Sequence, residues 1–181
     1  RRQRQMCIRD RFYLDLGAQV IGLDNFITGS RSNIEILKGY EGFEFMEWDI
    51  SKNLPDFSGR TIDFIFSLAS PASPIDFKTI PLEIMQVNSM GTQNLLELAK
   101  EKGARFLEAS TSEVYGDPEI HPQVESYVGH VNPIGERAPY DESKRYAEAM
   151  TMMYNRRYGV DTRIVRIFNT YGPRMRPDDG R

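Results

Sequence analysis

The stretch that decides the fold is RFLEASTSEVYG, from Arg105 to Gly116, together with YDESK, from Tyr140 to Lys144. The apolar run RFLEAS predicts a buried β-strand that ends at Ser110. The polar residues after it would reach the carboxyl edge of a sheet, where open α/β sheets bind their ligands. Three side chains are therefore expected to face a ligand: Thr111, Ser112 and Glu113.

Tyr140 and Lys144 are spaced so that both side chains would lie on one face of a helix. An ammonium beside a phenol favours the phenolate, so a tyrosine whose free pKa is about 10 becomes a base near neutral pH. A hydroxyl, a carboxylate and such a base in one crevice suit proton and hydride chemistry at a carbinol carbon. The spacing alone is common, and by itself it favours a surface helix with an incidental tyrosine and lysine.

Further strands are predicted on both sides of this stretch. The runs QVIGLD, FEFMEWD, IDFIFSL and TRIVRIF lie at residues 19–24, 43–49, 62–68 and 162–168. Two segments with helical spacing, residues 81–102 and 140–157, connect neighbouring strands. Strands that alternate with helices, without internal repeats, predict an α/β fold with a parallel doubly wound sheet.

The acid that ends the first of these runs, Asp24, has two interpretations. In a dinucleotide-binding fold, an acid at the end of the second strand binds the adenosine ribose hydroxyls. Asp24 also suits a turn ahead of Asn25, and the residues alone leave both interpretations open. Trp48, in the next run, is interpreted as a packing residue.

The composition argues against several classes of partner. The chain has 181 residues, enough for one sizeable domain, and no apolar run approaches the ~20 residues that span a bilayer. Its net charge of −3 argues against a nucleic-acid-binding surface. Cys7 is the only cysteine, so an internal disulfide is impossible and a reducing compartment is expected. His121 and His130 lack partners at ligand spacing, so no metal site is predicted.

Longer motifs carry a family resemblance. LASPASP, EVYGDPEIHPQ, GHVNPIGERAPYDESKR and RIFNTYGPR start at Leu68, Glu113, Gly129 and Arg166. With STSEVYG they resemble the extended short-chain dehydrogenase/reductase family, the NAD-dependent epimerases and dehydratases. Within that family they are most similar to the UDP-glucuronic acid decarboxylases, which form UDP-xylose. The resemblance covers the chain from about residue 11 to its end, and it implies a Rossmann-type fold with NAD as the cofactor.

The resemblance also implies roles for individual residues. Tyr140 would take the proton from the sugar 4-hydroxyl, Lys144 would lower the tyrosine pKa and bind the nicotinamide ribose, and Thr111 would hydrogen-bond the reacting oxygen. Glu113 would orient the substrate or a water at the sugar carboxyl end. The other residues implied on the NAD side are Asp24, Asn25, Asp49, Ile50, Leu68, Ser70, Ala109, Thr170 and Arg181. Those implied to hold the nucleotide sugar are Asn94, Tyr154, Asn169 and Arg174. The alternative for Arg174 is that it is a surface arginine after a Gly-Pro turn.

Ser112 discriminates between the reactions of the family. Related 4,6-dehydratases place Asp-Glu where this chain has Ser112-Glu113, because the loss of water needs a general acid as well as a base. Serine cannot be that acid, so the dehydratase is disfavoured, and the resemblance implies decarboxylation of UDP-glucuronate through a 4-keto intermediate. The alternatives are a nucleotide-sugar 4-epimerase or 4,6-dehydratase, or a non-catalytic NAD-binding regulator. Gln86 stands where family members commonly have a lysine, a cation expected near the substrate.

The two ends of the chain differ from the family pattern. Residues 1–11, RRQRQMCIRDR, match nothing in the family, and MCIRDR reads like a translated sequencing-adapter sequence. Residues 12–181 would form a partial NAD-binding domain. The glycine-rich phosphate loop of the family, which follows the first strand, is not in this sequence, and neither is most of the C-terminal substrate lobe. We therefore expect an internal fragment that neither folds stably as a monomer nor binds NAD tightly.

The intact protein is expected to be a homodimer, because family members usually pair two helices of each subunit. The segments 81–102 and 140–157 are the matching helices. The cytoplasm is the expected location, with a Golgi anchor on the intact protein as the alternative for a eukaryotic source.

Overall fold

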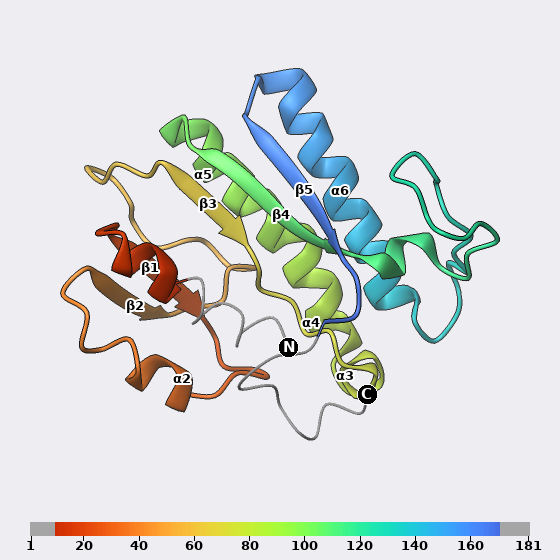
Figure 1. Ribbon diagram of the computed structural model, residues 1–181, viewed down its shortest axis with the longest axis horizontal. Coiled ribbons are helices and arrows are strands. Elements are labelled where there is room, and N and C mark those ends of the chain that lie inside the picture. Colours follow the sequence, from red (N-terminus) through yellow and green to blue (C-terminus); the bar gives the residue numbers. More distant parts are fainter. Residues whose placement is uncertain (1–9, 171–181) are drawn as a thin grey trace.

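The structure, a computed structural model, describes residues 10–170 (Figure 1). It begins with a short helix over residues 10–15. The elements that follow are β1 Val20–Asp24, α2 Ser32–Glu35, β2 Phe43–Glu47, β3 Phe64–Ser67, α3 Pro74–Thr79, α4 Pro81–Gln86, the π-helical turn η1 Val87–Gly91, α5 Thr92–Lys102, β4 Arg105–Thr111, the 3₁₀ turn η2 Ser112–Tyr115, α6 Ala138–Tyr158 and β5 Thr162–Ile167.

The five strands form two sheets in which every pair is parallel. β1 pairs with β2, and β3, β4 and β5 form a second sheet with β4 at its centre. The predicted strands and their parallel pairing are confirmed, so the α/β Rossmann-type fold class is correct. In the 3-2-1-4-5-6 strand order of this fold, the position between β1 and β3 belongs to the first strand. Within residues 10–170, no ladder of hydrogen bonds joins β1 to β3.

A long helical stretch precedes β4. We predicted one helix over residues 81–102, and the structure has α4, η1 and α5 in unbroken succession. The π turn is a local widening of the helix that apolar spacing does not reveal, and it buries Asn88. α5 ends at Gly103, where the sequence predicts its end, with a φ of 64° that glycine adopts without steric penalty.

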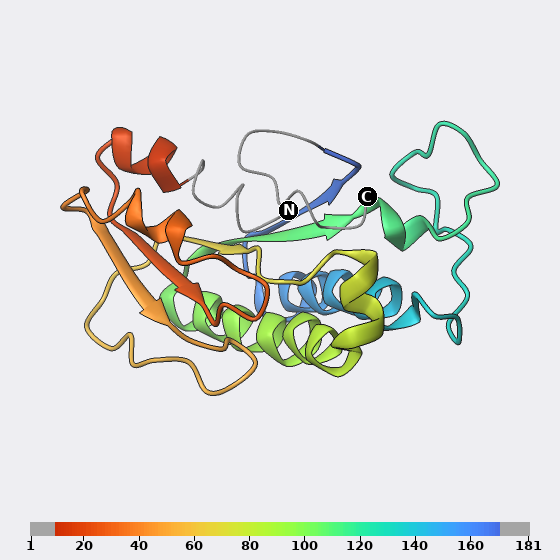
Figure 2. The same ribbon diagram turned by 90° about the horizontal axis from the view of Figure 1, so that it is seen from below.

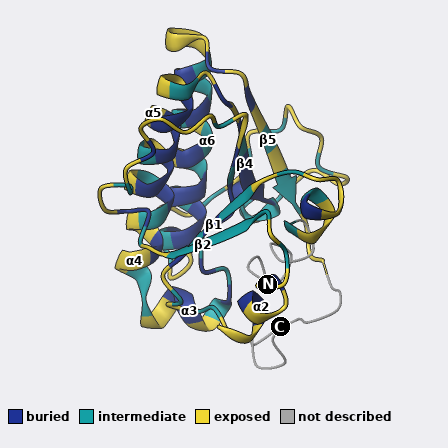
Figure 3. Cartoon of the chain, turned by 90° about the vertical axis from the view of Figure 1, so that its left-hand side faces the viewer, coloured by how far each residue is buried: buried dark blue, intermediate teal, exposed yellow. Residues whose placement is uncertain are grey.

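The helices cover the sheets from two sides. Figure 2 shows α4, α5 and α6 on one side, and the helix of residues 10–15 with α2 on the other. The main core lies between α5, α6 and the β3–β4–β5 sheet and contains Leu96, Phe106 and Tyr154. Figure 3 shows that α5 and α6 are buried along the side that faces β4. Ile21 and Leu23 of β1 also pack against this core, so side chains connect the two sheets.

The connection between η2 and α6, residues 116–137, is held to the body of the protein by two arginines. Arg145 of α6 donates to the carbonyl of Val128 at 2.8 Å, and Arg166 of β5 donates to the carbonyl of Glu125 at 3.0 Å. In this described part of the chain, no helix is long and apolar enough to cross a membrane. Residues 10–170 also contain no group of three or more His, Cys, Asp and Glu side chains placed to hold a metal ion.

Candidate active site

The carboxyl end of β4 carries the three residues that the sequence predicts at a ligand. Thr111 is the last residue of the strand, and its Oγ1 accepts a hydrogen bond of 3.3 Å from the backbone N–H of Glu113. This bond caps η2, which begins at Ser112 and turns the chain away from the sheet. Thr111 is buried, whereas Ser112 and Glu113 are partly exposed. All three therefore lie together at the strand end.

α6 brings the predicted base and its lysine to the same region. Tyr140 and Lys144 lie one turn apart on the buried face of the helix, with 2% and 1% of their surface exposed. The shared helix face is therefore confirmed. The Tyr140 ring stacks on Phe77 of α3, with the ring centroids 4.7 Å apart and the planes 15° from parallel. Packing thus fixes the orientation of the phenol ring.

Lys144 reaches across from α6 to β4. Its Nζ donates to Glu108 Oε1 at 2.8 Å and to the backbone carbonyl of Ala109 at 3.1 Å. Glu108 is completely buried and Lys144 nearly so, which makes this a buried salt bridge. The pair attaches the lysine to the strand that carries Thr111.

Two acids share one arginine at the start of α6. Arg137 donates from Nη2 to Glu113 Oε2, and its Nε lies 3.9 Å from Asp141 Oδ2. Asp141 is buried next to Tyr140, and its Oδ1 has no hydrogen-bond partner in the described residues. Burial raises the pKa of the Asp141 carboxyl to about 7; Arg137 opposes this rise, and Glu113 adds to it. Asp141 is therefore an acid that holds a proton close to neutral pH.

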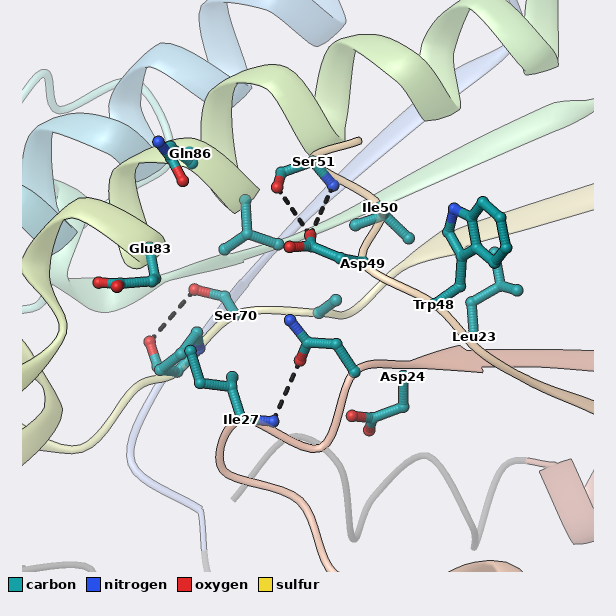
Figure 4. Close-up of a pocket in the computed structure, with 14 residues that line it drawn as sticks. Leu23, Asp24, Ile27, Trp48, Asp49, Ile50, Ser51, Ser70, Glu83 and Gln86 are labelled. Carbon is teal, nitrogen blue, oxygen red and sulfur yellow. Dashed lines mark hydrogen bonds between the residues drawn. The ribbon is translucent and has the colours of Figure 1, made fainter. Parts of the chain in front are cut away.

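A pocket lies where β1 and β2 end near the start of α4 (Figure 4). Asp24 Oδ1 accepts the N–H of Phe26 at 2.7 Å, and Asn25 Oδ1 accepts the N–H of Ile27 at 3.1 Å. Burial raises the pKa of Asp24, the Phe26 N–H opposes this, and Glu47 adds to it. These bonds fix the loop after β1 at the mouth of the pocket.

The opposite wall of the pocket follows β2. Asp49 Oδ1 accepts hydrogen bonds from the backbone N–H and the hydroxyl of Ser51, at 2.9 and 2.7 Å. Trp48 and Ile50 contribute apolar surface, and the Trp48 indole donates to the carbonyl of Asn53 at 2.8 Å. Carboxylate and amide oxygens suit ribose hydroxyls, and the apolar surface suits a base. The pocket therefore fits the adenosine part of NAD.

Several other predicted residues lie around this site. Ser70 lines the pocket, Leu68 is buried directly after β3, and Ala109 contributes the carbonyl that Lys144 binds. Gln86, which stands where family members commonly have a lysine, lines the pocket together with Asp24 and Asp49. Asn169 and Thr170 are exposed just after the carboxyl end of β5. Two of the predicted residues, Arg174 and Arg181, lie outside the described residues.

Two residues predicted to hold the nucleotide sugar, Asn94 and Tyr154, make hydrogen bonds within the fold. Asn94 of α5 donates from Nδ2 to two backbone carbonyls of the loop after β2, at 2.9 and 2.7 Å. Tyr154 lies about 21 Å along α6 from Tyr140, because each helical residue rises ~1.5 Å. Its hydroxyl donates to Glu97, and burial together with this bond raises the pKa of Tyr154. Both side chains therefore brace the fold, and their contact with a nucleotide sugar stays a prediction.

Comparison with known proteins identifies the family. A family model described as the NAD dependent epimerase/dehydratase family matches residues 11–181. The chain belongs to this family. NAD is the cofactor of this family. Among solved members of similar fold, UDP-glucuronic acid 4-epimerase from Bacillus cereus was determined in complex with NAD; it has a TM-score of 0.75 and 29% identity over 97% of this chain and 55% of that one.

Curated relatives within the epimerase/dehydratase family include several decarboxylases. UDP-glucuronic acid decarboxylase 1 of Xenopus tropicalis is 51% identical over 174 residues, which is 96% of this chain and 40% of the frog protein. UDP-glucuronic acid decarboxylase 1 of Arabidopsis thaliana is 53% identical over 165 residues, which is 91% of this chain and 37% of the plant protein. The chain thus spans about 40% of the length of the frog enzyme.

Solved structures of the epimerase/dehydratase family extend the likeness to other reactions. The UDP-glucose 4-epimerase of Thermotoga maritima has a TM-score of 0.81 and 25% identity, over 95% of this chain and 54% of that one. The dTDP-glucose 4,6-dehydratase of Streptomyces venezuelae, solved with NAD, has a TM-score of 0.81 and 28% identity, over 98% of this chain and 55% of that one. The fold is therefore common to epimerases and dehydratases.

Three residues of the site were not predicted from the sequence. They are Phe77, which stacks on Tyr140, Arg137, which binds Glu113, and Glu108, which binds Lys144. The signal for Glu108 was present, because a charge inside the apolar run RFLEAS requires a buried partner. Phe77 and Arg137 gave no such signal, since their partners depend on how α3 and α6 meet η2.

Proposed function

We propose that the protein to which this chain belongs is an NAD-dependent decarboxylase that converts UDP-glucuronate to UDP-xylose through a 4-keto intermediate. The observation that carries the proposal is the Ser112–Glu113 pair at the end of β4, with Glu113 bound to Arg137 beside Tyr140. Identity of 51% to a named decarboxylase supports it. The activity remains a proposal, because the chain spans about 40% of that relative.

In this reaction Tyr140 acts as the base. As a phenolate it accepts the proton of the sugar 4-hydroxyl, and Thr111 Oγ1 hydrogen-bonds the same oxygen. The Lys144 ammonium favours the phenolate by its charge. NAD, when bound, supplies the redox chemistry at C4 and is regenerated at the end of the cycle. The protein contributes the position of these groups and the local field.

The chemistry after oxidation follows from the position of the ketone. The 4-ketone lies β to the C5 carboxylate, so the C5–carboxylate bond breaks to release carbon dioxide and leaves an enolate that the ketone stabilises. A proton then adds at C5, and reduction at C4 restores the hydroxyl and gives UDP-xylose. No step requires a general acid for the loss of water, which agrees with Ser112 at the position where dehydratases have an acid.

The charges around Glu113 suit an anionic sugar. A uronate carboxylate near Glu113 would be repelled if that acid were unpaired, but Arg137 already binds it. Asp141 has a pKa of about 7, so it adds less than a full negative charge near neutral pH. The summed charge of Glu113, Asp141 and Arg137 is therefore closer to neutral than that of two unpaired carboxylates.

A nucleotide-sugar 4-epimerase is the second candidate. The fold does not separate it from the dehydratase, since the TM-score is 0.81 to both a UDP-glucose 4-epimerase and a dTDP-glucose 4,6-dehydratase; the observation in its favour is Ser112, which does not supply the acid of a dehydratase. The 4,6-dehydratase is disfavoured by Ser112, and a non-catalytic NAD-binding regulator is disfavoured because Tyr140, Lys144 and Thr111 are all present.

The deciding experiment is product analysis with the full-length protein. UDP-glucuronate and UDP-glucose are each incubated with it and NAD, and products are identified by mass spectrometry and proton NMR. We expect carbon dioxide and UDP-xylose from UDP-glucuronate and no product from UDP-glucose. Formation of UDP-galacturonate without carbon dioxide would instead establish the epimerase. Formation of a 4-keto-6-deoxy sugar would establish the dehydratase, and inactivity on both substrates would favour the regulator.

We also propose that the full-length protein is a cytoplasmic homodimer that pairs through α4 and α6. Apolar and aromatic side chains on these helices are exposed in the single chain: Leu82 by 68%, Met85 by 44%, Tyr146 by 48% and Met153 by 41%. Light scattering after size-exclusion chromatography measures the mass, and a monomer at micromolar concentration would exclude the pairing.

A further inference from the structure

We propose that Glu108 is a positioning residue for the reaction: its carboxylate keeps the Lys144 ammonium charged and holds it on β4, one helical turn from Tyr140. Glu108 would act only through Lys144 and would touch neither the sugar nor NAD. The catalytic part of this proposal rests on the proposed function, whereas the claim about the charge of Lys144 stands apart from it.

The geometry of the pair supports this role. Glu108 has no exposed surface, and Lys144 has 1%. Their 2.8 Å contact joins β4 to α6, and the same Nζ donates to the Ala109 carbonyl at 3.1 Å. The second oxygen, Glu108 Oε2, is buried and has no hydrogen-bond partner in the described residues. Within residues 10–170, Lys144 is therefore the one cation in salt-bridge contact with this carboxylate.

The consequence follows from the cost of burying a charge. Burial disfavours the charged form of a lysine and lowers its pKa, while a neighbouring carboxylate favours the charged form. If Glu108 lost its charge, this contact would no longer favour the ammonium, and burial would lower the pKa of Lys144. A neutral amine exerts little field on a phenol, so Tyr140 would ionise at higher pH.

The other charged or titratable groups around this part of α6 have partners of their own. Glu148, one turn further along α6, binds Arg166 of β5 and the hydroxyl of Ser110. Glu113 of η2 binds Arg137, which also lies near Asp141. β3 places an uncharged residue, Ser67, opposite Glu108, and η1 contributes the uncharged Asn88, which donates to Ser143. Tyr140 and Tyr154 are titratable groups on this buried side of α6, and the Tyr154 hydroxyl donates to Glu97. Glu108 is thus the carboxylate committed to Lys144.

The test uses the full-length protein and the variant Glu108→Gln, which keeps the shape and an acceptor oxygen but removes the charge. Lysines are labelled with carbon-13 at the ε carbon, and the Lys144 signal is assigned by its loss in Lys144→Arg. We expect the Lys144 titration in Glu108→Gln to move down by at least about one pH unit. Glu148→Gln is the matched control, since it removes a carboxylate from the same interface and should leave the Lys144 titration unchanged.

The kinetic arm measures kcat and KM for UDP-glucuronate against pH. In Glu108→Gln we expect the acidic limb of the kcat profile to move to higher pH by about one unit or more. At any pH on that limb, kcat should therefore be roughly tenfold lower than in the parent protein. KM for the sugar should change by less than about twofold, because Glu108 does not touch it. Glu108→Asp retains the charge, so its acidic limb should stay close to that of the parent protein. If Glu108→Gln fails to fold, Glu108→Asp is the variant in which the limb is measured.

Two results would overturn the proposal. One is a Lys144 titration and an acidic limb that stay in place while stability falls, which would make Glu108 a structural residue only. The other is a limb that moves to lower pH, which would mean that Glu108 opposes the field of Lys144 at Tyr140. If the protein does not decarboxylate any nucleotide sugar, the NMR titration still decides whether Glu108 keeps Lys144 charged.

Discussion

The Asp141 carboxyl, next to the proposed base, links a single residue to the pH dependence of stability. Burial raises its pKa from 3.8 to about 7. Because the folded-state pKa lies above the unfolded one, the folded state holds the proton more tightly, and stability falls as pH rises from about 4 to about 7. Asp141→Asn cannot ionise and resembles the neutral acid. We expect no gain in this variant near pH 4, and a gain that grows to roughly 1–3 kcal/mol near pH 7 and then levels off.

Urea unfolding at several pH values between about 4 and 8 measures this difference. Asp161→Asn is the control, because Asp161 is an exposed carboxyl whose ion pair with Arg163 contributes little. Equal stability of Asp141→Asn and the parent at every pH would show that Asp141 ionises in the folded state without cost.

Tyr140→Phe removes the hydroxyl of the proposed base and keeps the aromatic ring. The ring still stacks on Phe77, so the free energy of unfolding should change by less than about 1 kcal/mol. The rate of decarboxylation by the full-length protein should fall by roughly 10²–10⁴, the contribution typical of a general base. Tyr146→Phe, on the exposed side of the same helix, should keep its activity. Retention of activity by Tyr140→Phe would remove Tyr140 from the mechanism.

Some residues of the site could be placed from the sequence, and others could not. Thr111, Tyr140 and Lys144 could be placed correctly because one strand end and one helical turn define them. Glu108 could not be assigned a partner, since its contact with Lys144 depends on how α6 packs on β4. The role of Tyr154 stays a prediction, because a motif match gives a residue type and not its contacts: its hydroxyl donates to Glu97, about 21 Å along α6 from Tyr140.

At the scale of elements, the turn after η2 holds the site segment to the connection that precedes α6. Gly116 has a φ of 65°, and its N–H donates to the carbonyl of Glu113 at 3.0 Å. His130 lies against it, because the N–H of Asp117 donates to the His130 carbonyl at 2.9 Å. A Cβ on Gly116 would lie 2.1 Å from that carbonyl oxygen. Glycine is therefore required here both for its backbone conformation and for space.

Gly116→Ala should destabilise the protein by roughly 2–4 kcal/mol, the sum of a strained φ and a backbone clash. Gly59→Ala separates the two effects, since Gly59 has a φ of 74° but a Cβ added there would meet nothing within 4 Å. We expect about 1 kcal/mol for that control. Thermal unfolding of both variants gives the comparison, and equal losses would mean that the connection moves aside without cost.

The elements themselves were predictable to a large degree because their signals are local. Each of the five strands is an apolar or β-branched run, and Gly103 marks the end of α5 in the sequence as in the structure. The π turn η1 was not predictable, because residues 87–91 follow the same apolar spacing as the helices around them. The separation of β1–β2 from β3–β4–β5 was expected from the strand order, since no run in the sequence fills the position between β1 and β3.

At the scale of the whole molecule, this separation divides the chain into parts of unequal stability. β4 is hydrogen-bonded on both sides and lies over the main core with α5 and α6. In the part of the chain that the structure describes, β1 and β2 bond only to each other, and the cluster beside them has two buried members, Leu14 and Leu37. Regions with fewer buried apolar contacts open at lower free energy. The β1–β2 part should therefore unfold first.

The chain contains its own probe for this order of events. Trp48 is the only tryptophan, and it lies directly after β2, whereas most of the helical signal comes from α5 and α6. In urea, the fluorescence transition of Trp48 should come at a lower concentration than the circular dichroism transition of the helices, which is not two-state behaviour. Coincident transitions would instead show that side-chain packing of Ile21 and Leu23 on the main core makes the chain one cooperative unit.

NAD should bring the two transitions together. The pocket takes Asp24 and Asp49 from the β1–β2 part, and it takes Ser70 and Gln86 from the part that contains the main core. A ligand that binds only when both parts are folded stabilises the weaker one by about 2.7 kcal/mol at a free concentration one hundred times its Kd. In this chain, NAD at such a concentration should therefore shift the Trp48 transition upward and leave the helical transition less changed. If NAD moved both transitions equally, or neither, the pocket would not connect the two parts.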